Sequence, residues 1–484
     1  MKRLKFRYLF AVYAVVLSCV CMFWIYPAHD DWGYAAPKPG VNILERLMPR
    51  KAFWRPFDRL IEYGLGYAPS LWPGFNHVFR LAGHFLLCLF LYAVLKKLTD
   101  NKKYSAIGTF FLCLSPSILT TVTNSDYINQ VWAMLSGLTS AFFFFKAYKS
   151  RKSLYYVLWM LFAFVSVFWK ENGIVWFIAP VMLNVTYLFT KGESLASSAR
   201  RNFVYILAGL AGMLLYFSAR FYLIGGVSLG SADGGKGRYL LNFSVLHIIR
   251  NYSLIIGGAV TSIDSLALFM KPRNIPIIII TGVTSVIFLC FILARIYDIF
   301  RNKRRLFWGL VMLFVCAGYI SSSYAIVGHN NESTSYEMIF MSGLILGIIL
   351  SSSRPPKWSN AIIAAMFACM LLSSCHKLYV MHNYTLGVRN FLAEHAGDFR
   401  NTPDKAYVYF IDDIPEDGFA VYTYPAGHGL NYGGAFNSLW GWKAAIKIEC
   451  VSSDADIKFT SDSLPEYDTV FSLTQSGKIK VLRN

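Results

Sequence analysis

The chain is poor in charge, and acidic residues are especially scarce. Aspartate and glutamate together number 27 in 484 residues, and all charged residues make up only 15% of the sequence. Hydrophobic residues reach 55% and aromatic residues 17%, with a mean hydropathy of +0.43. Many apolar runs reach the roughly 20 residues that a helix needs to cross a bilayer. This composition excludes a soluble enzyme and predicts an α-helical polytopic membrane protein.

The sequence also lacks a cysteine framework. Most of its nine cysteines lie inside apolar runs, where a thiol behaves as a small hydrophobic group. Only Cys375 and Cys450 could face an oxidising compartment, and a disulfide between them has no other support. No Cys/His spacing is typical of a zinc site, so we assign no residue as a metal ligand.

The net charge of +19 would suggest a nucleic-acid partner in a soluble protein. In a membrane protein the simpler cause is that basic residues collect in cytoplasmic loops, so we expect no nucleic acid. Lys2, Arg3, Lys5 and Arg7 precede the first apolar run and place the N-terminus in the cytoplasm. That run, 8–26, lacks a clear cleavage site and is kept as the first span.

Apolar runs and basic turns together predict eleven spans. They are 8–26, 75–95, 105–121, 131–145, 154–168, 173–189, 203–222, 275–296, 307–324, 336–350 and 361–379. Residues 244–270 are apolar enough for a further span. That span would move the basic residues near 301–305 to the outside, so we expect an external helical segment there instead.

Two regions outside the spans have their own patterns. Residues 43–47 and 57–63 mix apolar and charged residues at helical spacing, which predicts short amphipathic helices on the outer membrane surface. The chain then divides into a transmembrane domain, 1–379, and a small soluble α/β domain, 380–484. Alternating apolar residues at 406–411, with shorter runs at 445–450 and 469–473, predict strands in the second domain. Because the N-terminus is predicted in the cytoplasm and the number of spans is odd, we expect that domain on the outer side of the membrane.

Two adjacent acids follow the first span. Asp30 and Asp31 lie in the sequence His-Asp-Asp-Trp-Gly-Tyr, at a predicted membrane surface. A carboxylate at such a boundary is costly to desolvate and usually has a function or a partner. One interpretation is a general base at the mouth of a membrane cavity. The other is a solvated loop whose acids cap a following helix.

Several further polar residues map to the same outer face. The first outer loop carries six basic residues, and these could attract anionic headgroups or clamp a lipid phosphate. Arg55, held between Trp54 and Pro56-Phe57, is the best single candidate for the clamp. Other candidates, each with a structural alternative, are the Lys170-Glu171 pair, Asp126 in the second outer turn, His77 and His84 on one helix face, and Tyr336.

Taken in order, these motifs resemble the GT-C superfamily of membrane glycosyltransferases, especially the protein O-mannosyltransferase and related bacterial branches. The resemblance covers roughly residues 8–350. The matching motifs are Asp30-Asp31-x-x-Tyr34, Arg55-Pro56, His77 through His84, Ser115-Pro116 leading to Asp126, and Lys170-Glu171-Asn172. Two positions depart from the pattern: Arg80 stands where asparagine is expected, and Tyr336-Glu337 lacks the arginine often found nearby.

The resemblance implies a polyprenyl-phosphate-linked sugar as donor, transferred on the outer face. One acid of the pair, with Asp30 favoured over Asp31, would activate the acceptor hydroxyl, while Arg55 and Lys170 would stabilise the departing phosphate. The acceptor would be a polysaccharide, a lipid-linked glycan or a protein. Whether a divalent cation takes part is an open question. Some branches of the superfamily use one, and Asp30, Asp31 and Asp126 could act with or without it.

Two other classes share this topology. A lipid-linked sugar flippase or polysaccharide polymerase should show charges at mid-membrane or a long arginine-rich outer loop, and few charges lie within the predicted spans. A non-catalytic assembly protein would need neither the acid pair nor the outer arginines. The short loops favour a bacterial inner membrane, with the C-terminal domain in the periplasm.

Overall fold

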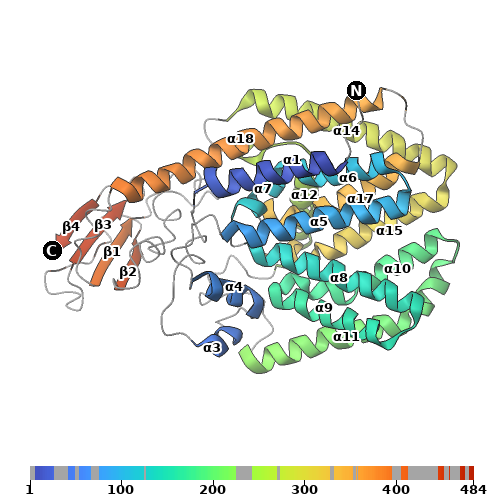
Figure 1. Ribbon diagram of the computed structural model, residues 1–484, viewed down its shortest axis with the longest axis horizontal. Coiled ribbons are helices and arrows are strands. Elements are labelled where there is room, and N and C mark those ends of the chain that lie inside the picture. The colour runs from blue at the N-terminus through green and yellow to red at the C-terminus, as the bar shows by residue number, and fades with distance from the viewer. Residues whose placement is uncertain are drawn as a thin grey trace.

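The computed structural model describes most of the helical part of the chain and the strands near its end. The described residues are 6–26, 42–49, 54–66, 76–124, 127–224, 242–269, 273–327, 332–352, 356, 358–394, 405–411, 445–451, 457, 460, 469–474 and 479–483. Figure 1 shows long helices that run side by side along the long axis of the molecule.

Each of the eleven predicted spans falls on helical structure. The matching elements are α1 (Phe6–Cys19) with η1 (Val20–Trp24), α5 (Asn76–Thr99), α6 (Lys102–Leu114) with α7 (Pro116–Thr123), α8 (Ile128–Ser150), α9 (Ser153–Trp169), η4 (Glu171–Phe177) with α10 (Ala179–Thr190), α11 (Leu195–Ile224), α14 (Ile275–Asn302), α15 (Arg304–Ile320), α17 (Tyr336–Ser352) and α18 (Ser359–Glu394). The long apolar runs therefore located the helices correctly.

The number of helices that can cross a membrane is smaller. In the part of the chain that the structure describes, eight helices are long and apolar enough, or nine if α6 and α7 form one span. The chain is thus an α-helical polytopic membrane protein, whereas the count of eleven spans stays a prediction. Helices α9 and α15 have 17 residues each. Each is about 25 Å long, less than the roughly 30 Å of a hydrocarbon core.

A proline causes the break in the third predicted span. Pro116 is the first residue of α7, and the axes of α6 and α7 differ by 60°. Because a proline forces the preceding residue out of the helical region, Ser115 is extended (ψ 124°) and ends α6. All eight residues of α7 are buried, so this short helix turns into the bundle.

The bundle is packed through close backbone contacts. A Cβ atom at Gly108 of α6 would lie 2.4 Å from the carbonyl oxygen of Gly343 in α17. The two helices therefore touch backbone to backbone, which is how small residues support helix packing in membranes. In contrast, large side chains such as Leu214 on α11 and Val286 on α14 are exposed, as expected for surfaces that face lipid.

Short helices lie between the long ones. The two predicted amphipathic segments form α3 (Ile43–Leu47) and α4 (Pro56–Gly66), which Figure 1 shows together at one end of the bundle. The predicted external segment contains α12 (Val245–Val260) and α13 (Ser265–Phe269). It is helical as expected, while its side of the membrane stays a prediction. The remaining short elements are α16 (Ser322–Ala325) and η5 (Glu332–Ser335).

Helix α18 continues to Glu394, past the domain boundary predicted after residue 379. Its second half binds the end of the first helical segment. The Tyr26 amide donates to Thr385 Oγ1 at 3.2 Å, Arg389 donates to the Tyr26 hydroxyl at 2.9 Å, and His382 lies 2.7 Å from the Trp24 carbonyl oxygen. The chain is therefore fixed to α18 immediately before the loop that contains the two acids.

Four strands follow α18. They are β1 (Lys405–Ile411), β2 (Ala445–Val451), β3 (Thr469–Thr474) and β4 (Ile479–Arg483), in the order β2-β1-β3-β4. Strand β1 is parallel to both β2 and β3, and β4 is antiparallel to β3. The three predicted strands are present, and β4 is additional. The α/β class of this domain stays a prediction. Cys375 is a free thiol, so the disulfide considered for it is absent.

Candidate functional site

The structure places six of the nine candidate site residues. Asp30, Asp31 and Asp126 lie outside the described residues, so their predicted roles stay predictions. Arg55, Lys170 and Glu171 gather at the end of α9, around the start of η4. His77, His84 and Tyr336 belong to a neighbouring group at the starts of α5 and α17.

Arg55 and Glu171 form an ion pair although 116 positions separate them in sequence. Arg55 Nε lies 2.8 Å from Glu171 Oε2, with 19% and 8% of the two side chains exposed. Trp54 fixes this segment, because its indole stacks on Tyr216 and donates to the Leu47 carbonyl oxygen at 3.1 Å. The basic loop after the first span is thereby attached to α9 and α11.

A tight turn presents the residues that follow α9. Lys170 is extended (φ −156°, ψ 140°), which stops α9 before the 3₁₀ helix η4 begins at Glu171. Glycine is required at position 173, because a Cβ atom there would lie 2.4 Å from the Ser166 backbone. This turn directs Lys170, Glu171 and Asn172 into the interior at the end of α9.

A second arginine approaches Glu171 from α11. Arg220 NH1 lies 4.0 Å from Glu171 Oε1, and its side chain is fully buried. The same guanidinium donates to the Tyr216 hydroxyl at 3.4 Å. Sequence analysis missed Arg220, although a charge inside an apolar run is a recognised sign of function. Arg220 lies four residues before the end of α11, so the expectation that the polar groups lie at the membrane surface stays a prediction.

Lys170 joins a polar network centred on Glu337. Its Nζ donates to Gln130 Oε1 at 3.1 Å, and the Gln130 amide donates to Glu337 Oε2 at 3.1 Å. Asn172 Nδ2 and the Tyr324 hydroxyl donate to Glu337 Oε1 at 3.0 and 3.2 Å. Glu337 is buried, so three donors replace the water that its carboxylate would otherwise bind.

Tyr324 also links two members of this network, because its hydroxyl accepts from Asn172 Nδ2 at 2.6 Å while it donates to Glu337. The Lys170 ammonium also lies 5.8 Å from the Tyr324 ring and 5.6 Å from the Tyr127 ring, within the range of cation–π attraction.

Glu171 Oε1 and Asn172 Oδ1 are buried at this site, and neither accepts a hydrogen bond from the residues that the structure describes. Glu171 Oε1 faces Arg220 NH1 only at the longer distance of 4.0 Å. An unsatisfied buried acceptor costs about 1–3 kcal/mol unless a donor reaches it. Their position beside Arg55 and Lys170 makes them suited to hydroxyl groups of a bound molecule.

The two histidines and Tyr336 are packed inside the helices. His84 lies between two phenols, with Nδ1 2.9 Å from the Tyr336 hydroxyl and Nε2 2.8 Å from the Tyr13 hydroxyl. His77 contacts Arg80, which also donates to the Val122 carbonyl oxygen at 2.7 Å. All of these groups except Tyr13 are fully buried. This geometry favours the structural alternative for His77 and His84 over direct phosphate binding.

The charges at the end of α9 suit an anionic ligand. Arg55, Lys170 and Arg220 carry three positive charges against the two acids, Glu171 and Glu337, when all are ionised. Among the described residues, no group of three or more His, Cys, Asp or Glu side chains could hold a metal ion. The acids of the predicted loops are outside that set, so a divalent cation stays an open prediction.

Comparison with known proteins does not name a family. Neither a protein-family model nor a curated protein matches this chain. The likeness to GT-C glycosyltransferases therefore depends on the sequence motifs alone.

Proposed function

We propose that this protein is a GT-C-type glycosyltransferase that moves a sugar from a polyprenyl-phosphate donor to an acceptor hydroxyl. The observation that carries the proposal is the contact of Arg55 with Glu171, 2.8 Å apart, beside the buried Arg220. This contact supports a site in which the loop after the first span meets the Lys-Glu motif. The resemblance implies that Arg55 and Lys170 stabilise the same departing phosphate.

The proposed reaction needs a base and a cationic site. Asp30 or Asp31 takes the proton of the acceptor hydroxyl, and the acceptor oxygen bonds to the anomeric carbon of the sugar. The bond between that carbon and the phosphate oxygen breaks, and the polyprenyl phosphate leaves with the electron pair. Arg55 and Lys170 stabilise the charge that develops on the phosphate.

Two acceptors at the site support a sugar rather than a phosphate alone. Phosphate oxygens accept hydrogen bonds, so they suit Arg55 and Lys170 but give no hydrogen bond to Glu171 Oε1 or Asn172 Oδ1. Sugar hydroxyls donate hydrogen bonds and would satisfy both atoms. A glycosyl phosphate offers acceptors and donors together, which matches this mixed set of groups.

The proposed setting is a bacterial inner membrane. The N-terminus would be cytoplasmic, and the site and the C-terminal domain would lie on the periplasmic side. The acceptor would be a polysaccharide, a lipid-linked glycan or a protein.

The main test measures transfer from a radiolabelled polyprenyl-phosphate sugar in membranes that contain the wild type, Asp30→Asn or Asp31→Asn. Asp100→Asn is a matched control, because Asp100 is an exposed acid at the opposite end of α5. We expect one loop variant to lose transfer while it still binds the donor, and the control to keep full activity. If neither loop variant differs from the wild type, the acid pair is a helix cap and not the base.

The alternative is a lipid-linked sugar flippase or polysaccharide polymerase. A flippase should carry charges at mid-membrane, whereas Glu337 lies in the first turn of α17 and Arg220 lies four residues before the end of α11. The same membranes distinguish the two functions. A flippase would change the side on which the labelled lipid is accessible without forming a new glycosidic bond.

A further inference from the structure

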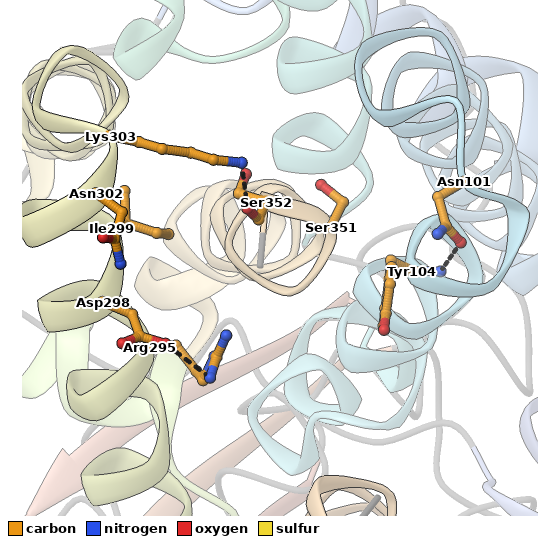
Figure 2. Close-up of a pocket in the computed structure, with 9 residues that line it drawn as sticks. All are labelled: Asn101, Tyr104, Arg295, Asp298, Ile299, Asn302, Lys303, Ser351 and Ser352. Atoms are coloured by element: carbon orange, nitrogen blue, oxygen red, sulfur yellow. Dashed lines mark hydrogen bonds and ion pairs between the residues drawn. The ribbon is translucent and has the colours of Figure 1, made fainter. Parts of the chain in front are cut away.

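A cavity of about 640 Å³ lies at the other end of the bundle, between the start of α6 and the ends of α14 and α17. Figure 2 shows its lining. It is remote from the candidate site, because Tyr336 begins α17 whereas Ser351 and Ser352 end it. The cavity therefore needs an explanation of its own.

The lining is polar and its fixed charge is positive. Arg295 and Lys303 are its cations and Asp298 is its acid; Ile299 is the one apolar lining residue. Arg295 is only 11% exposed and pairs with Asp298 at 3.0 Å, while Asp298 is 48% exposed. The arginine is therefore held inside the cavity, and water screens much of the acid's charge.

Lys303 crosses the end of α17. Its Nζ donates to the Ser352 carbonyl oxygen at 2.5 Å, as Figure 2 shows. The last carbonyl groups of a helix repel anions, so this ammonium offsets the one feature of the cavity that would oppose a negative ligand. An ammonium has three donors and can bind an anion at the same time.

Neutral donors complete the lining. Asn101 caps α6 with its Oδ1, which accepts from the Lys103 and Tyr104 amides, so its side-chain NH₂ group is the part that can serve a ligand. Tyr104 adds a phenol. The Ser351 hydroxyl donates to the Ile348 carbonyl oxygen at 2.8 Å, so its oxygen is left to accept from a headgroup hydroxyl. Such donors beside two cations suit a phosphate group and its ester substituents.

The surroundings favour a ligand at headgroup depth. The turns at this end of the bundle are strongly basic, with Lys96, Lys97, Lys102, Lys103, Arg301 and Arg304. Basic pockets between transmembrane helices on the cytoplasmic side bind anionic lipid headgroups, and each nearby cation adds to the attraction. A soluble phosphate ester would gain from the same charges but not from the bilayer.

We propose that this cavity binds the phosphate headgroup of an anionic phospholipid. Arg295 and Lys303 hold the phosphate oxygens, and Asn101, Tyr104 and Ser351 serve the ester oxygens and headgroup hydroxyls. This binding site is independent of glycosyl transfer and uses different residues.

The test measures how phosphatidylglycerol and phosphatidylcholine bind the purified full-length protein, by native mass spectrometry in detergent. We expect the wild type to prefer phosphatidylglycerol, and Arg295→Gln or Lys303→Gln to weaken its binding about tenfold, the usual effect of losing one charge-assisted hydrogen bond. Asp298→Asn should strengthen it, because it removes the one acid among the described residues of the lining. Such a gain would not result from damage to the fold.

A matched control separates this cavity from general surface charge. Lys149→Gln removes a cation from the last turn of α8, outside the cavity, and should leave lipid binding unchanged. The proposal is overturned if Lys149→Gln weakens binding as much as Arg295→Gln, or if neither cavity variant weakens it. It is also overturned if millimolar glycerol phosphate displaces the lipid, because the site would then recognise a soluble phosphate ester.

Discussion

Glu171→Gln is the most informative single change at the candidate site. The carboxylate of Glu171 lies between Arg55 and Arg220, at 2.8 and 4.0 Å. For the same effective dielectric constant, Coulomb attraction is inversely proportional to distance, so Arg55 attracts the Glu171 carboxylate more strongly than Arg220 does. Arg55 is 19% exposed and water can solvate it when the acid is removed. Arg220 is fully buried, so the cost of the change comes mainly from this residue.

Removing one partner of a buried ion pair costs about 3–5 kcal/mol, because the remaining charge loses its nearby counter-charge in a site where water cannot replace it. We expect a loss of this size in the free energy of unfolding of Glu171→Gln, measured in mixed micelles. In the double variant with Arg220→Met, most of that loss should be recovered, since the buried charge is gone as well. A loss below about 1 kcal/mol for Glu171→Gln, or no recovery in the double variant, would refute this account of Arg220.

Three further changes test other parts of the structure. Gly108→Ala should lower the free energy of unfolding by about 1–3 kcal/mol, because its methyl group meets the backbone of α17, whereas Gly282→Ala has open space and should be neutral. Tyr324→Phe should cost about 1 kcal/mol by removing a donor to Glu337. Arg55→Gln should lower the rate of sugar transfer about tenfold to a hundredfold in a radiolabel assay, because a cation at the departing phosphate is lost. Arg55→Lys keeps the charge and should retain more of the transfer activity.

The sequence predicted the helices well because each is a long apolar run. Where a predicted span differs from the observed helix, a local feature interrupts the apolar run. The span predicted at 105–121 bends at Pro116, and the one predicted at 173–189 begins with the 3₁₀ helix η4. Whether α9 and α15 cross the membrane depends on tilt and local bilayer thickness, which a hydropathy pattern does not contain.

The candidate site was only partly predictable. Charge on the outer loops identified Arg55, Lys170 and Glu171 as a set, but no local pattern could show that Arg55 reaches Glu171 across 116 positions. That contact depends on how Trp54 packs against Tyr216. Gln130 was missed for a different reason, because an uncharged amide on an apolar helix has no distinctive signal until its partners are known.

The length of α18 has a mechanical consequence. Its 36 residues make a rod of about 54 Å, well beyond the roughly 30 Å of a hydrocarbon core, so one part of it must project from the membrane. Tyr26 is bonded to this helix at Thr385 and Arg389. A displacement of the C-terminal half of α18 would therefore be passed directly to Tyr26, the last described residue before the two acids.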